Sequence, residues 1–187
     1  MYVAIEAPPN ARHMRTVYTL LVELGKDGGK EIGRLFDSLS LDHPARTVFG
    51  QSRLTTDKTR AGVFSGALGQ IRLWSDVSIA WLTADQDHDL AQAGTKPTAV
   101  YLVIPDERST YDMLATLYVT QMYQALVDLS NVSPGRKLPV RVNLVLDEFG
   151  NLPPFPDFCK KLTTSAGRNI RCFLASFPSP AYAAGLF

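Results

Sequence analysis

Cysteine is scarce in this chain of 187 residues, and the scarcity excludes two classes of small domain. Cys159 and Cys172 are the only two, they do not form a C-x-x-C pair, and no histidine lies at metal-binding spacing from them. The sequence therefore argues against a disulfide framework and against a zinc site, and it favours a reducing compartment.

Long apolar runs and an excess of charge are also missing. No apolar run could span a bilayer, and the start, MYVAIEAPPN, lacks the basic residues and long apolar core of a signal peptide. Lys plus Arg total 19 against 18 Asp plus Glu, a net charge of +1, so any contact with nucleic acid would be local. With 45% hydrophobic residues the chain can bury a sizeable core. We therefore expect a soluble chain.

Two common catalytic motifs do not occur. There is no G-x-S-x-G elbow, which argues against a serine hydrolase. Residues 25–31, GKDGGKE, look like a P-loop, but the spacing is one residue short and Glu31 replaces the Ser or Thr that binds Mg²⁺. This motif also joins two expected helices, so we interpret it as a turn.

Asp85, Asp87 and Asp89 alternate as in a calcium loop but lack its glycine and its distant glutamate, which indicates a solvated loop.

The first half of the chain shows the periodicity of short helices. Apolar residues recur at helical spacing, for example at Ile32, Leu35, Phe36 and Leu39. Asn10 is expected to cap the first of these helices and Thr55 or Thr56 a longer one, in which Gly62, Gly66 and Gly69 suggest close approach of another helix. We expect an all-α domain over residues 10–95, preceded by the end of a truncated element at 1–9.

The second half alternates between strand and helix patterns. Strands are expected at Thr98–Ile104, Val142–Leu146 and Ile170–Ala175. A long helix that starts at the capping box of Ser109 and Asp112 and ends near Leu129, and a short one over Asp157–Ala166, connect them. This order predicts an α/β fold with a parallel sheet over residues 96–175, whose central strand is covered on both faces. Residues 176–187 are expected to form an irregular tail.

Asp147 and Glu148 follow the central strand directly. Ligands of open α/β sheets bind outside the carboxyl ends of the strands, so this pair could hold Mg²⁺ and activate a water, although a solvated acidic turn explains it equally well. Arg168 precedes the last strand and could stabilise phosphate charge across a subunit boundary, with an exposed turn arginine as the alternative. Lys58, Arg60 and Arg72 could contact phosphates or form a solvated helix face.

Three segments of the second half resemble one family. They read TAVYLVIPDERSTYDMLATLYVTQMYQAL, LPVRVNLVLDEFGNLPPFPDF and AGRNIR, and they closely resemble the TraG-type coupling ATPases of conjugation and type IV secretion. DEFGNLPPFPDF is the most specific part. HPART and DKTRAGVFSGAL in the first half resemble, more weakly, the all-α domain inserted in the motor domain of that family. The resemblance covers about Met1 to Phe173.

The resemblance implies a partial RecA-like P-loop NTPase sheet with an inserted all-α helical domain. Asp147 would belong to the Walker B motif and bind Mg²⁺ through water, and Glu148 would polarise the water that attacks ATP. Arg168 would reach the nucleotide of a neighbouring subunit in a homo-hexamer. The motor would move single-stranded DNA with its relaxase, or protein effectors, into the type IV secretion channel at the cytoplasmic side of the bacterial inner membrane. The all-α domain would choose the substrate.

The sequence also departs from the family pattern. The Walker A loop and the membrane anchor of the family lie upstream of where this chain begins, and Phe177 stands near an expected Gln. We therefore expect a central, cytoplasmic fragment that is inactive alone. Two alternatives are a non-catalytic adaptor that binds substrates through the helical domain, and another hexameric DNA translocase of the FtsK type. The latter would not be expected to carry DEFGNLPPFPDF.

Overall fold

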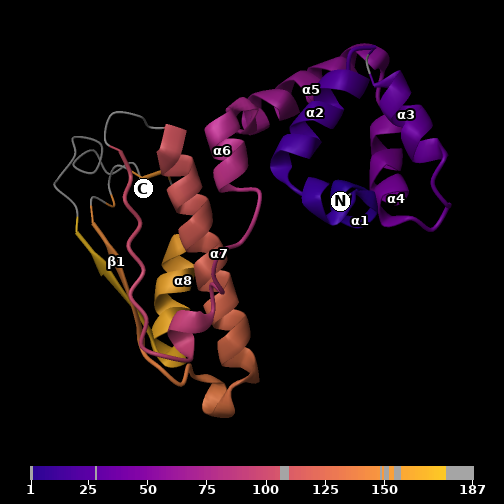
Figure 1. Ribbon diagram of the computed structural model, residues 1–187. Coiled ribbons are helices and arrows are strands. Elements are labelled where there is room, and N and C mark those ends of the chain that lie inside the picture. The colour runs from indigo at the N-terminus through magenta and orange to yellow at the C-terminus, as the bar shows by residue number, and fades with distance from the viewer. Residues whose placement is uncertain are drawn as a thin grey trace. The chain divides into compact units, whose positions relative to one another are not determined.

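The computed structural model describes residues 2–27, 29–105, 110–147, 149, 152–153 and 157–175. The chain divides into two compact units, Met1–Asp87 and His88–Phe187, and each is described by itself (Figure 1). None of the described helices is both long and apolar enough to cross a membrane.

Every regular element described in the first unit is helical. Short 3-10 turns at Pro9–Ala11, Gln51–Leu54 and Arg72–Ser75 separate some of its helices. The helices are α1 (Tyr2–Glu6), α2 (Met14–Leu24), α3 (Lys30–Asp37), α4 (Pro44–Gly50), α5 (Asp57–Ile71) and α6 (Val77–Leu82).

Side-chain caps mark the starts of α2, α4, α5 and α6. Thr56 Oγ1 accepts from the Thr59 N–H at 3.4 Å and so caps α5, as predicted. The prediction for Asn10 is wrong, because Asn10 lies in a 3-10 turn and His13 caps α2 through its Nδ1, 3.4 Å from the Thr16 nitrogen. The sequence pattern thus located the helices better than it located this cap.

The packing of the first unit centres on buried apolar side chains from several helices, including Ile32, Trp74 and Ile79. The Phe36 ring stacks on Phe49 with centroids 4.5 Å apart. The glycines of α5 have no part in this packing, since a Cβ added at Gly62, Gly66 or Gly69 would meet nothing within 4 Å. The expectation of close helix approach at these glycines is therefore wrong.

The second unit combines helices with a small parallel sheet. β1 (Val142–Leu146) pairs in parallel with β2 (Ile170–Leu174), from Val142 opposite Ile170 to Leu146 opposite Leu174. Figure 1 shows α7 (Thr110–Val132) and α8 (Phe158–Ser165) together on one side of these strands. The two parallel strands and their connecting helix agree with the α/β class. The core contains Ala93, Met122, Tyr123, Leu126, Leu138, Val142 and Ile170.

Two expectations for this unit are wrong. Thr98–Ile104 is not a strand, and β1 and β2 are the strands of the described chain. Residues 98–101 instead line a pocket together with Tyr118 and Met122 of α7. β1 is also covered on one face only: Val142 and Leu146 are buried, whereas Val145 is 70% exposed. The Ser109 cap and the tail at 176–187 lie outside the described residues.

Candidate functional site

Asp147 lies at the carboxyl edge of the parallel strand pair. It follows β1 directly and is exposed. Backbone hydrogen bonds bracket it on both sides: Ala175 donates to the Leu146 carbonyl at 3.0 Å, and Phe149 donates to the Ala175 carbonyl at 2.9 Å. The backbone pairing therefore continues past the strand ends and fixes where Asp147 leaves the sheet. Glu148 lies outside the described residues.

An aromatic stack holds the segment that follows the acidic pair. The rings of Phe149 and Phe158 lie 4.7 Å apart between centroids and 29° from parallel, which ties the end of β1 to α8. Leu152 donates to the Phe149 carbonyl at 3.3 Å. Sequence reasoning missed both phenylalanines, although each follows an acidic residue in DEFG and PDF and is apolar in a polar setting.

Arg168 lies at the opposite edge of the same strand pair. It ends the 3-10 turn Ala166–Arg168, just before β2 begins at Ile170. Five strand residues separate the two edges, and at about 3.3 Å per residue the distance between the edges is about 16 Å. The structure therefore does not bring Arg168 and Asp147 together within one chain.

The backbone around Arg168 is well anchored. Its carbonyl accepts from the Leu138 N–H at 3.0 Å, and its Nη1 donates to the Thr164 carbonyl at 3.3 Å. Asn169 follows in the left-handed region, at φ 68°, and its amide donates to the Leu138 carbonyl at 3.1 Å. The Nε of Arg168 is buried and has no hydrogen-bond partner in the described part of the chain.

Two other predicted features, Arg60 and the GKDGGKE turn, have structural roles. Arg60 donates to the carbonyls of Ser52 and Thr55 at 3.3 and 3.0 Å and pairs with Asp57 at 3.3 Å, so its guanidinium is occupied at the start of α5. Lys58 and Arg72 are exposed. In the GKDGGKE turn, Asp27 Oδ1 accepts from the Lys30 nitrogen at 2.9 Å. A carboxylate of the chain itself therefore occupies the N-terminus of α3, and the interpretation as a turn between two helices is confirmed.

Comparison with protein families identifies the chain. A family model described as type IV secretory system conjugative DNA transfer matches residues 4–176, which span both units. The chain belongs to this family. The resemblance inferred from DEFGNLPPFPDF is thereby confirmed. Searches of curated proteins and of solved structures give no significant match.

The matched family acts in conjugative DNA transfer by a type IV secretion system. The carboxylate oxygens at the carboxyl edge of β1 can be compared with the ligands that Mg²⁺ takes beside a bound nucleotide. No group of three or more His, Cys, Asp or Glu side chains that could hold a metal occurs among the described residues. Mg²⁺ in nucleotide sites commonly takes one or two carboxylates and completes its shell with phosphate oxygens and water. The exposed carboxylate of Asp147 fits one such position.

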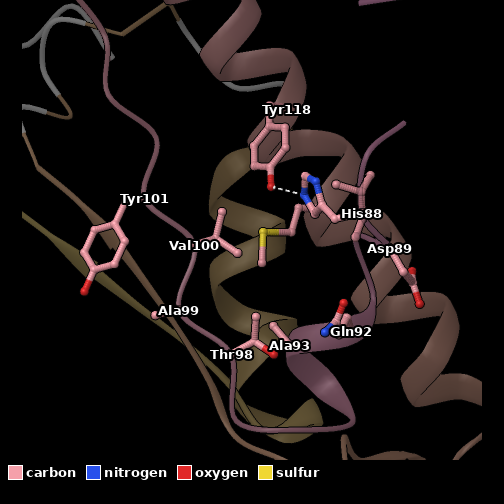
Figure 2. Close-up of a pocket in the computed structure, with 11 residues that line it drawn as sticks. His88, Asp89, Gln92, Ala93, Thr98, Ala99, Val100, Tyr101 and Tyr118 are labelled. Atoms are coloured by element: carbon pink, nitrogen blue, oxygen red, sulfur yellow. Dashed lines mark hydrogen bonds between the residues drawn. The ribbon is translucent and has the colours of Figure 1, made fainter. Parts of the chain in front are cut away.

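A separate pocket of about 320 Å³ lies in the second unit of this conjugative-transfer chain. In Figure 2, His88 and Tyr118 meet at one end of it, where His88 Nε2 and the Tyr118 hydroxyl share a hydrogen bond of 2.7 Å. Burial raises the pKa of the Tyr118 hydroxyl above its ordinary value. Neither Asp147 nor Arg168 lines the pocket. Sequence spacing gave no signal for this contact, because its two residues are 30 positions apart.

Proposed function

We propose that this chain forms the Walker B part of an ATP-driven, RecA-like motor that couples DNA or protein substrates to a type IV secretion channel. The observation that carries the proposal is the position of Asp147 at the carboxyl end of β1, within a parallel strand pair and next to Glu148 in sequence. This is the edge at which open α/β sheets bind ligands. A family role in conjugative DNA transfer favours an energy-driven translocation motor over a hydrolase of small substrates.

In this proposal each residue of the acidic pair has a distinct task. Asp147 holds Mg²⁺ through water, and Glu148 orients and polarises the water that attacks the γ-phosphate. The ion, when bound, neutralises the charge that develops on the phosphate oxygens. The stack of Phe149 on Phe158 supports the position of Asp147, because it ties the residues that follow β1 to α8.

A phosphate-binding loop is the other half of such a nucleotide site. The sequence of this chain contains no P-loop motif, and Asp27 fills the helix N-terminus at the segment that looks most like one. We therefore propose that hydrolysis needs a P-loop supplied from outside these residues. The purified chain alone should not turn over ATP.

Arg168 is proposed to act on the nucleotide of a neighbouring subunit in a homo-hexamer. Its separation from Asp147 by the length of the strands argues against a role at the site of its own chain. Hydrogen bonds of its carbonyl with Leu138 and of its Nη1 with Thr164 hold it at the edge of the strand pair that precedes β2. An arginine supplied in trans stabilises the charge of the transition state and commonly accelerates phosphoryl transfer by about 10³–10⁵-fold.

Mixed assemblies test this role. In a motor that contains this chain and a P-loop, Arg168→Ala and Glu148→Gln should each abolish ATP turnover while ATP binding persists. Mixing the two variants should restore part of the turnover, because some interfaces then combine an intact Glu148 with an intact Arg168. Arg171→Ala, an exposed arginine in β2, is the matched control and should keep native turnover. Absence of recovery in the mixture, with both variants assembled, would contradict action in trans.

A non-catalytic adaptor that presents substrates through the first unit is the second candidate. The exposed tryptophan of α6 favours it, because such a residue suits a docking surface. Mg²⁺-dependent ATP hydrolysis that Glu148→Gln abolishes would exclude the adaptor.

A further inference from the structure

The segment that leads into β1 holds the turn that carries Arg168. The Leu138 N–H donates to the Arg168 carbonyl at 3.0 Å. Four residues later, the Val142 N–H donates to the Asn169 carbonyl at 3.1 Å. Leu138, Val142 and Ile170 are 2%, 6% and 0% exposed, so both segments are rooted in the core of the second unit. The backbone of Arg168 is therefore tied to the core from both sides.

The side chain of Asn169 adds a bridge between the same two segments. Its Nδ2 donates to the Leu138 carbonyl at 3.1 Å, and its Oδ1 accepts from Arg141 Nε at 3.2 Å. One amide thus acts as donor and acceptor at once, which an ionised carboxylate cannot do because it only accepts. We call the contacts among Leu138, Arg141 and Asn169 the Asn169 bridge.

The backbone conformation of Asn169 explains why an asparagine suits this position. Asn169 lies in the left-handed region, at φ 68° and ψ 28°, which asparagine adopts more readily than most residues with a side chain. Glycine would allow the same φ but would supply no bridge. The position directly after Arg168 therefore combines a conformational requirement with two specific hydrogen bonds.

A fixed backbone matters most for a residue that must reach another subunit. The Nη1 of Arg168 donates to the Thr164 carbonyl at 3.3 Å, within the same chain. Because the backbone of Arg168 is held, its side chain alone has to turn toward a phosphate, and the ordering cost is limited to that side chain. A displacement of about 1 Å in a group that acts on a reacting centre can cost about 10²-fold in rate. Contacts that hold Arg168 can therefore control hydrolysis from a distance.

We propose that Asn169, supported by Arg141, is a positioning residue for Arg168 in the hydrolysis of ATP bound to a neighbouring subunit. Asn169 acts through the backbone of Arg168 and does not itself touch the nucleotide. The role in hydrolysis rests on the proposed function of Arg168, whereas the Asn169 bridge is a property of the chain itself. The two parts are therefore tested in separate experiments.

Amide hydrogen exchange of the whole chain tests the bridge. Asn169→Gly keeps the left-handed backbone and removes both side-chain bonds, so exchange of the Leu138 N–H should accelerate about tenfold. Arg141→Ala removes one bond and should accelerate it about threefold. Asn131→Gly, at an exposed asparagine in the last turn of α7, is the matched control and should leave this exchange native. Native exchange at Leu138 in Asn169→Gly would overturn the bridge.

Single-turnover ATP hydrolysis tests the positioning role in a motor that contains this chain and a P-loop. Asn169→Gly should lower the rate by about 10²-fold, while the Kd for ATP and hexamer assembly stay native. The residual rate of Arg168→Ala should not fall further when Asn169→Gly is added, because a positioning residue has no task without the residue that it positions. Subunits with Asn169→Gly should regain turnover when mixed with Glu148→Gln subunits, as Arg168→Ala subunits should.

The outcomes separate the positioning role from the proposed function. Native hydrolysis by Arg168→Ala would refute the action of Arg168 in trans, and the positioning role with it. Reduced hydrolysis by Arg168→Ala together with native hydrolysis by Asn169→Gly would refute the positioning role alone. Losses from Arg168→Ala and Asn169→Gly that multiply in the double variant would indicate independent structural damage and would also overturn the positioning role.

Discussion

Removing the Phe158 ring should loosen the segment that carries the acidic pair. Phe158→Ala deletes the partner on which Phe149 stacks at 4.7 Å. The stack is worth about 0.5–1.5 kcal/mol beyond its buried area, and the lost apolar contact of a half-buried ring adds about 1 kcal/mol. Local opening should therefore become easier by about 2 kcal/mol, which is roughly a 30-fold rise in the open population.

Amide hydrogen exchange measures this local opening separately at each residue. The Phe149 N–H donates to the Ala175 carbonyl, so its exchange should accelerate by roughly 30-fold in the variant. The Val142 N–H, bonded to the Asn169 carbonyl at the other end of β1, should change much less. Lys160→Ala, an exposed substitution in the same helix, serves as the control. Unchanged exchange at Phe149, or equal acceleration at Val142, would refute the argument that the stack holds this segment.

Two further predictions concern the core of the second unit. Leu126 is fully buried, so Leu126→Ala should lower the free energy of unfolding by about 2–5 kcal/mol, and a denaturant midpoint that stays native would contradict the packing described here. Burial raises the pKa of the Cys172 thiol, against a smaller opposing effect of its hydrogen bond with Ser165. Cys172 should therefore react with iodoacetamide more slowly than the exposed Cys159 near pH 8, and equal rates in the native chain would be inconsistent with its burial.

The strands around the site were largely predictable because their apolar pattern is strong. The bounds of β1 agree with the expected Val142–Leu146, and β2 ends one residue before the expected Ala175. The helical pattern between the two strands predicted that they pair in parallel. The position of Asp147 was predictable for the same reason, since a residue that follows such a strand must lie at its carboxyl edge.

The errors in the second unit arise where structure depends on partners far away in sequence. Thr98–Ile104 has the apolar content of a strand, but composition cannot tell whether its backbone reaches the ladder of β1. The exposure of Val145 has a similar cause, because an apolar run indicates burial without specifying what covers each face. The contacts of Phe149 with Phe158 and of His88 with Tyr118 join separate elements, and no periodicity encodes such pairs.

Mg²⁺-dependent ATP hydrolysis is the most direct test of the proposed motor. It should be measured for a motor that contains this chain and a P-loop, in native form and with Asp147→Asn or Glu148→Gln. Glu148→Gln should lower kcat by about 10²–10⁴-fold with ATP binding retained, as expected when the group that activates the water is lost. Asp147→Asn should raise the Mg²⁺ concentration needed for turnover. Native turnover in both variants would contradict the assignment of the acidic pair to the nucleotide site.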